Sequence, residues 1–229
     1  MDNVFSDPRV RELQKTFEMK LQGVLPAGKI QLGIVRALRP LTASDKTVTF
    51  NLGDKNKVVP GIEMLMPDDR ITVVFSQAVG IYVVPAATTG TGASAVKTED
   101  KANGKFISSP HTGVFTAAEI KSLKPFFNAT LSFDTDQTKR FDAMSATMFQ
   151  DVNGQASTEI PYGMKHLFLP SYYPVVGGKV NTLTATMPSE SIITDIAGTA
   201  TSSNYGCMEF GCMYLVGGDK EAILKALFG

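Results

Sequence analysis

Residues 70–85 read RITVVFSQAVGIYVVP and form the longest apolar, β-branched stretch of the chain. As a single strand they would extend about 50 Å, which is longer than most strands of globular proteins. We therefore predict a bulge or a bend at Gly80, which gives one long bent strand or two consecutive strands. Because a strand this apolar needs cover on both faces, the fold is predicted to be a sandwich or a barrel.

Period-two alternation marks further strands on both sides of this stretch. The main ones are expected at Ile30–Leu38, Thr47–Leu52, Ala129–Asp134, Phe141–Phe149, Lys179–Met187 and Tyr205–Val216. Helical segments are short and do not alternate with the strands as an α/β fold requires. We predict a mainly β protein, an antiparallel β-sandwich built as a single jelly roll, with a short N-terminal amphipathic helix and a C-terminal helix after Asp219.

The N-terminal helix is expected over Asp7–Gly23, because Asp7 is a good N-cap and Pro8 suits the first helical position. One face is apolar and carries Val10, Leu13, Phe17 and Leu21, whereas much of the remainder is basic and carries Arg9, Arg11, Lys15 and Lys20. Two interpretations stay open. Either the helix packs its apolar face on its own domain, or residues 1–28 form an arm, separate from a β domain at 29–229, that docks on a neighbouring subunit. An arm of this kind could instead turn its basic face inward, toward nucleic acid or anionic lipid.

The segment Ala86–Lys105 is rich in small and polar residues. Such side chains bury too little apolar area to offset the entropy of ordering, so we predict a mobile loop, or one ordered only by contacts, at one end of the β domain. Farther on, Thr116 and Glu119 match a capping box, which predicts a short helix that ends at Pro125.

The 229 residues include 22 basic and 22 acidic side chains, and 43% of the residues are hydrophobic. A chain of this length suits one large β domain or two small ones. Zero net charge gives no overall electrostatic footprint for nucleic acid, and a charged fraction of 19% is low for a soluble surface. The chain is therefore either an ordinary neutral protein or a subunit whose surface is largely covered by neighbours.

The chain opens without a basic stretch followed by an apolar segment, and no run of about 18 apolar residues occurs. We expect neither a signal peptide nor a membrane span. Cys207 and Cys212, on one extended strand, would point to opposite faces and lie too far apart for a disulfide. Two reduced thiols are consistent with folding in a reducing cytoplasm.

The residue patterns predict no catalytic residue, no cofactor site and no metal site. His111 and His166 lack a nucleophile motif and are interpreted as a loop residue and a strand-end residue. Cys207 and Cys212 do not complete a zinc site with His166, because they diverge and a second pair of ligands is missing.

Two further patterns have structural explanations. Asp134 and Asp136 resemble the start of a calcium loop, but its glycine and final glutamate are missing, so a hairpin turn is preferred. Tyr172 and Tyr173 lie between two prolines and are interpreted as a contact at the edge of a loop, with a small exposed aromatic patch as the alternative.

The whole chain resembles the jelly-roll capsid proteins of icosahedral, non-tailed bacteriophages. The features that carry the resemblance are the amphipathic helix at Asp7–Gly23, a β domain that begins near Lys29, and long Ala/Thr/Gly/Ser-rich segments at Ala86–Lys105 and Thr194–Asn204. A low charge content and ten methionines add to it. The resemblance implies self-assembly into a closed shell, with the helix facing inward or clasping a neighbour, and the length indicates one jelly roll rather than two.

We therefore expect a structural virion protein, a capsid subunit that self-assembles into a homo-oligomeric shell, with no enzymatic activity, cofactor or small-molecule substrate. It would fold in the host cytoplasm and reside in the virion. Its expected partners are copies of itself and other virion proteins, and the genome or anionic lipid through the N-terminal arm. Two alternatives stay open: a receptor- or glycan-binding spike or adhesion module on a β-sandwich, and a β-sandwich hydrolase whose carboxylates a sequence does not reveal.

Overall fold

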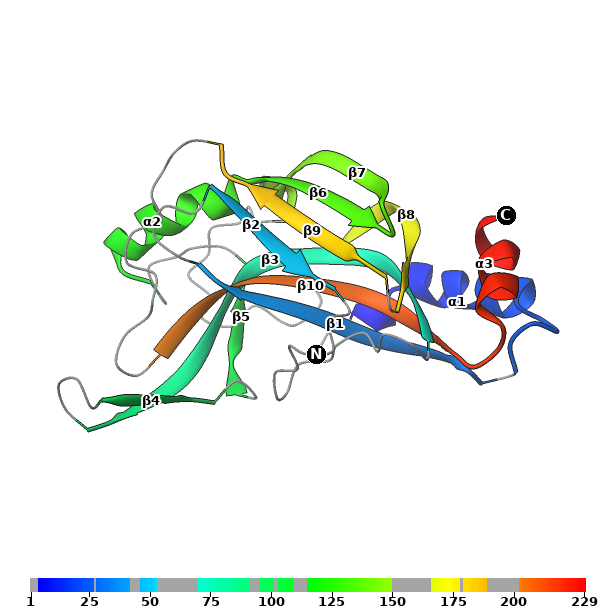
Figure 1. Cartoon of the computed structure of the whole chain (residues 1–229), viewed down its shortest axis with the longest axis horizontal. Coiled ribbons are helices and arrows are strands. Elements are labelled where there is room, and N and C mark those ends of the chain that lie inside the picture. Colours follow the sequence, from blue (N-terminus) through cyan, green and yellow to red (C-terminus); the bar gives the residue numbers. More distant parts are fainter. Residues whose placement is uncertain are drawn as a thin grey trace.

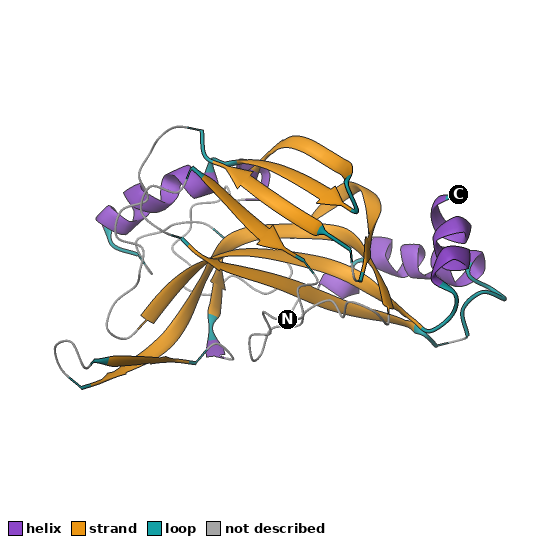
Figure 2. Cartoon of the chain, viewed as in Figure 1, coloured by secondary structure: helices purple, strands orange, loops and turns teal. Residues whose placement is uncertain are grey.

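The computed structural model describes residues 4–26, 28–41, 46–52, 70–90, 95–100, 103–108, 115–149, 166–177, 179–188 and 202–229. These residues form a mainly β protein in which two antiparallel sheets make a sandwich, which confirms the predicted fold class (Figure 1). Helices lie toward two opposite ends of the sandwich (Figure 2).

The larger sheet has six strands in the order β1-β10-β3-β4, with β5 and β8 also paired to β3. Its strands are β1 (Ile30–Pro40), β3 (Arg70–Thr89), β4 (Val96–Glu99), β5 (Lys105–Ile107), β8 (Leu167–Val176) and β10 (Ser202–Val216). The smaller sheet has the order β2-β9-β6-β7 and consists of β2 (Thr47–Asn51), β6 (Thr130–Thr135), β7 (Thr138–Ser145) and β9 (Asn181–Thr186). The helices are α1 (Pro8–Lys20), α2 (Ala117–Phe127) and α3 (Lys220–Phe228), with short 3-10 segments η1 (Val4–Ser6) and η5 (Ala146–Phe149).

Strands from the N-terminal half of the chain pair with strands from the C-terminal half, and each successive pair lies closer to the middle of the sequence. β1 pairs with β10, β2 with β9 and β3 with β8, and β6 and β7 form the central hairpin. Successive pairs alternate between the larger and the smaller sheet. This arrangement, in which one long hairpin is rolled into two sheets, is that of a jelly roll, and β4 and β5 are additions between β3 and β6.

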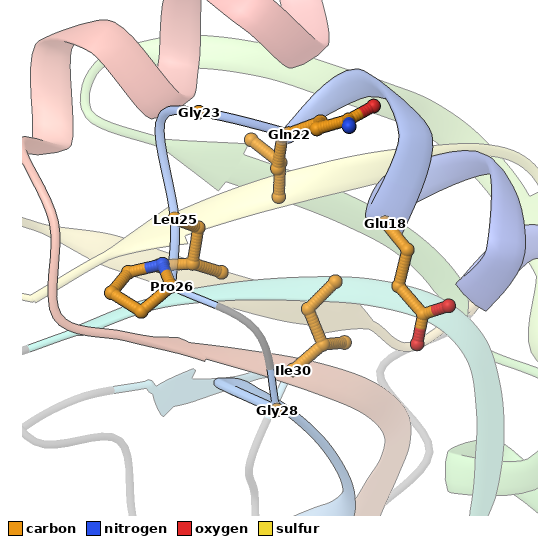
Figure 3. Close-up of a pocket in the computed structure, with 8 residues that line it drawn as sticks. Glu18, Gln22, Gly23, Leu25, Pro26, Gly28 and Ile30 are labelled. Atoms are coloured by element: carbon orange, nitrogen blue, oxygen red, sulfur yellow. The ribbon is translucent and has the colours of Figure 1, made fainter.

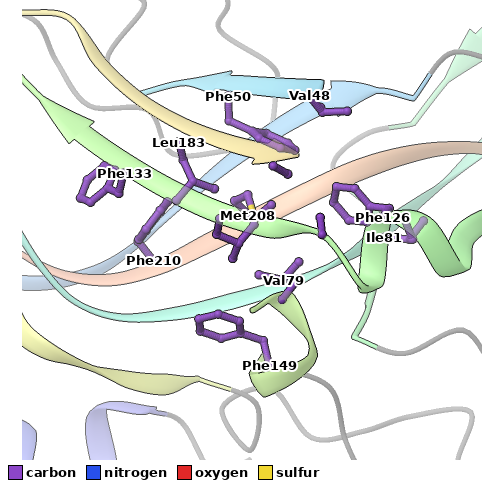
Figure 4. Packing of buried hydrophobic residues seen from close by; sticks show 14 of the residues in the cluster. Val48, Phe50, Val79, Ile81, Phe126, Phe133, Phe149, Leu183, Met208 and Phe210 are labelled. Atoms are coloured by element: carbon purple, nitrogen blue, oxygen red, sulfur yellow. The ribbon is translucent and has the colours of Figure 1, made fainter. Parts of the chain in front are cut away.

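The core between the sheets is aromatic and aliphatic, and Figure 4 shows side chains from both sheets meeting there. The rings of Phe133 on β6 and Phe210 on β10 stack across the sandwich with centroids 5.7 Å apart. α2 closes one end of the core, where Phe126 lies 6.4 Å from Phe50 of β2. The predicted inward residues of the last strand are confirmed, since the core includes Met208, Phe210, Cys212 and Tyr214, with Val216 packed against it.

The strand that contains residues 70–85 is continuous, and its irregularity lies beside Ser76. The register shifts between Val74 and Ser76 against β8, and between Gly211 and Cys212 against β10. This bulge reverses which residues face the core: Val74 lies in the core before it, and Val79 after it.

Gly80 is therefore not the site of the predicted bulge. A Cβ atom at this position would clash with the carbonyl oxygen of Ile107 on β5. Glycine is needed here because the backbone of β5 approaches β3 closely, which a sequence pattern alone does not show.

The predicted loop at Ala86–Lys105 is instead partly a ribbon. β3 continues to Thr89, and its segment Ala86–Thr89 pairs with β4. Figure 1 shows this ribbon projecting away from the sandwich, and most of its described side chains are exposed. Backbone pairing, rather than burial of side chains, orders this part of the chain.

Two elements continue through prolines, and for α2 this corrects the predicted end at Pro125. α2 begins with the predicted capping box but continues through Pro125 to Phe127, with Pro125 buried in its last turn. β8 runs through both Pro170 and Pro174. Within the described residues β8 pairs with β3 alone, and an edge strand tolerates proline because one of its sides needs no N–H donor.

Candidate functional site

A buried ion pair occupies the outer face of the larger sheet. Arg36 on β1 and Glu209 on β10 are direct cross-strand partners, and the Arg36 Nε atom donates a hydrogen bond to Glu209 Oε1. The side chains of Arg36 and Glu209 are 11% and 2% exposed. Two charges this deeply buried are tolerated because each neutralises the other.

The ion pair extends to a tyrosine on the neighbouring strand β3. The Arg36 Nη1 atom lies 3.3 Å from the hydroxyl oxygen of Tyr82, and its guanidinium carbon lies 4.7 Å from the centre of that ring. Burial lowers the pKa of Arg36, but the attraction of Glu209 and Cys207, the hydrogen bond to Glu209 and the attraction of Tyr82 together outweigh burial, and the net pKa is raised. Burial also raises the pKa of Tyr82. Arg36 therefore stays charged and Tyr82 stays neutral.

A histidine and a serine lie on the other side of Glu209. His166, which immediately precedes β8, has its Nε2 atom 3.6 Å from Glu209 Oε2 and its Nδ1 atom 3.3 Å from Ser76 Oγ. Ser76 is at the bulge of β3, opposite Gly211, where any Cβ atom would clash with the serine hydroxyl. The fold thus places serine, histidine and glutamate in line, from three separate segments.

This order of groups resembles a nucleophile, a base and an orienting acid. However, Ser76 is fully buried and the Glu209 side chain is 2% exposed, so no substrate atom reaches the serine hydroxyl in this structure. The Glu209 carboxylate is also shared with Arg36. A hydrogen bond can form between His166 and Ser76, and the Glu209 carboxylate lies between Arg36 and His166.

Sequence reasoning missed this cluster. The prediction that His166 lies at a strand end is confirmed, whereas His111 lies outside the described residues. The available signal was a charged residue in the middle of each of two apolar strands. Arg36 lies in IQLGIVRALRP, which carries a second arginine, Arg39, beside its final proline, and Glu209 is the single charge of SSNYGCMEFGCMYLV. A charge in the middle of such a strand predicts a buried partner, but the strand register is needed to identify it.

The apolar face of α1 packs on its own sheet. Val10, Phe17 and Leu21 are buried, and Leu13 is partly buried. They join a cluster that contains Ile71, Val73 and Phe75 of β3, Met213 and Leu215 of β10, and Ile223 and Leu227 of α3. This is the first of the two interpretations of the helix. Docking on a neighbour stays a prediction, and it would require α1 to leave this cluster.

The basic residues of α1 have mixed surroundings. Arg9 is held by Asp7, with Nη2 and Oδ2 2.7 Å apart, and its guanidinium carbon lies 3.8 Å from the centre of the Phe168 ring. The Lys20 Nζ atom lies 3.4 Å from the hydroxyl oxygen of Tyr172. Arg11 and Lys15 are exposed, as are Arg9 and Lys20, so the predicted basic face is accessible from outside.

A cavity of about 540 Å³ lies where the chain turns from α1 into β1 (Figure 3). It is lined by Glu18, Leu21, Gln22, Gly23, Leu25, Pro26, Gly28 and Ile30. Gly23 and Gly28 allow the turn, with φ angles of 81° and 73°. Among the described residues, this lining contains one carboxylate and no nucleophile or histidine, so these residues offer apolar contact rather than acid–base chemistry.

The two cysteines lie on opposite faces of β10, as predicted, and both are buried free thiols. Within the described residues, no group of three or more His, Cys, Asp and Glu side chains could hold a metal ion. Asp136 and Gln137 form a tight turn between β6 and β7, with φ angles of 48° and 64°. The predicted hairpin turn is therefore confirmed, with two residues between the strands.

Both thiols are expected to be unreactive in the native protein. Burial raises the pKa of Cys207 well above its ordinary value, and the thiolate is the reactive species. A disulfide reagent at pH 8 should modify neither thiol of the native protein and both thiols after unfolding in guanidinium chloride. Rapid modification of either thiol without denaturant would contradict this expectation.

In the parts of the chain that the structure describes, no helix is both long enough and apolar enough to cross a membrane. Comparison of the chain with protein-family models, with curated proteins and with solved structures finds no match.

Proposed function

We propose that this chain is a structural virion protein, a capsid subunit that assembles with copies of itself into a protein shell. The observation that carries the proposal is a jelly roll with a ribbon, β3–β4, that projects from the sandwich and is exposed. Jelly rolls serve in viral capsids, but also in lectins and cupins, so the fold supports the proposal by analogy alone.

The projecting ribbon favours assembly among these uses. A ribbon of two strands with little buried area is only marginally stable in water. A shell subunit meets several neighbours, and a projecting ribbon would be covered by one of them. Zero net charge points the same way, because copies of a neutral chain do not repel one another over long distances.

The other proposed partners are further virion proteins and, through α1, the genome or anionic lipid. Because Arg9 is paired with Asp7, this contact would depend on the exposed side chains of Arg11 and Lys15. Folding in the host cytoplasm and residence in the virion belong to the same proposal.

Electron microscopy and sedimentation velocity of the purified full-length protein test the proposal. We expect closed particles, or ring- and sheet-like intermediates, that grow with protein concentration. A small discrete oligomer would favour the receptor- or glycan-binding alternative. A strict monomer at high concentration, with no particles, would overturn the proposal.

A further inference from the structure

Among the strands that the structure describes, β4 has an open outer edge. Within the described residues β4 pairs with β3 alone, and it ends the strand order of the larger sheet. Val96, Lys97 and Thr98 are exposed, and Val96 is 61% exposed. Such an edge presents unpaired N–H and C=O groups along one side and can accept another strand.

Two side-chain contacts tie the ribbon to the end of β10. The Lys97 Nζ atom donates a hydrogen bond to the carbonyl oxygen of Ser202 at 2.7 Å. The Tyr205 hydroxyl donates to Glu99 Oε2 at 2.6 Å. The edge is therefore held in one orientation before any partner binds, which reduces the entropy cost of association.

The sequence of β4 is complementary to itself in one antiparallel register. If Thr98 lies opposite Thr98 of a second copy, Lys97 lies opposite Glu99 of that copy, and by symmetry the pair occurs twice. Opposite charges directly across two strands stabilise the pairing, and to form these pairs Lys97 and Glu99 would exchange their contacts with Ser202 and Tyr205 for contacts across the axis. Sliding one copy by two residues would instead set Lys97 against Lys97, or Glu99 against Glu99. The charges thus favour this register over the shifted ones, and they disfavour pairing of β4 with strands that lack the complementary charges.

We propose that β4 pairs edge to edge with β4 of a second copy, antiparallel, with a two-fold axis at Thr98. The pairing joins two ribbons into one four-stranded sheet, β3-β4-β4-β3, between subunits. The inference rests on the proposed function, because the β4–β4 pair would be one of the contacts between subunits of the shell. Such a dimer can also form without a shell.

A cysteine on the axis tests the geometry. In this register the two Cα atoms at position 98 lie about 4.5–5.5 Å apart, within the range of a disulfide. Thr98→Cys should therefore form a cross-linked dimer under mild oxidation, seen on a non-reducing gel. Both native cysteines are buried and should not contribute.

Thr88→Cys is the matched control, because Thr88 is in the same ribbon, paired to Lys97. With strands about 4.8 Å apart, the two Thr88 residues would lie at least about 14 Å apart across the axis. This variant should stay monomeric on the gel. Equal cross-linking at both positions would indicate random collision and would overturn the pairing.

A charge exchange tests the register. Lys97→Glu should weaken dimerisation about tenfold in sedimentation velocity, because two attractive pairs become repulsive. The double variant Lys97→Glu/Glu99→Lys restores opposite charges between copies and should recover the dimer, although it does not restore the contacts to Ser202 and Tyr205. Lys121→Glu, an exposed site on α2, changes the net charge equally and should have no effect.

The outcomes separate this inference from the proposed function. Two results would overturn the strand pairing but not the proposed shell. One is particles without a cross-linked Thr98→Cys dimer, and the other is a double variant that dimerises as weakly as Lys97→Glu. A specific dimer without particles would support the pairing and count against the shell. Neither dimer nor particles would overturn both.

Discussion

Replacing Glu209 with leucine is expected to lower the free energy of unfolding by about 3–5 kcal/mol, because Arg36 is then left buried without its carboxylate. The pair is 11% and 2% exposed, so water cannot substitute for the missing oxygen atoms. His166 also loses a neighbour, since its Nε2 atom lies 3.6 Å from Glu209 Oε2. The measurement is urea unfolding at neutral pH.

Two control variants separate the destabilisation caused by an unpaired buried charge from that caused by losing one side chain. Glu221→Leu changes an exposed glutamate on α3 and should alter stability by less than about 0.5 kcal/mol. The double variant Arg36→Met/Glu209→Leu removes both charges and should be more stable than Glu209→Leu alone, because no unpaired charge remains. A double variant that is less stable than either single variant would contradict this explanation.

Replacing Phe17 with alanine is expected to cost about 3–5 kcal/mol of unfolding free energy, the usual range for a buried phenylalanine. Phe17 is fully buried, and its ring lies edge-on to Tyr172 with centroids 4.9 Å apart. The loss should appear in the unfolding of the single chain and should not depend on protein concentration.

Met19 supplies the matched control on the same helix, because it is 70% exposed. Met19→Ala should change stability by less than about 0.5 kcal/mol. The pair of variants also tests the predicted arm. If α1 served mainly to clasp a neighbour, Phe17→Ala would impair assembly and leave the unfolding of the single chain unchanged.

Several elements could be predicted because their signals are local. Asp7, Thr116 and Asp219 cap their helices through side-chain oxygens that accept from backbone N–H groups two or three residues later. The inward face of β10 follows from strict alternation. These features depend on neighbours along the chain, so the residues themselves specify them.

The misplaced bulge has a different physical origin. Gly80 and Ser76 both lie within an apolar run, and nothing local distinguishes a glycine that bends a strand from one that admits a neighbouring backbone. The approach of β5 to Gly80, and the register shift beside Ser76, come from strands distant in the sequence. The ribbon at Ala86–Thr89 was mistaken for a loop for the same reason, since its order comes from backbone pairing with β4.

The sequence by itself determined the fold class of this protein, because the spacing of apolar residues and the helix-capping residues depend on only a few neighbouring positions. It also placed residues 70–85 in the middle of the fold. Only the tertiary structure decided that α1 covers its own sheet, that Arg36 meets Glu209 across 173 positions, and that β4 pairs with β3 alone among the described strands. Those features depend on the register between strands and on which helix and sheet faces pack together. Both are fixed by contacts between residues that are far apart in the sequence, so local patterns do not reveal them.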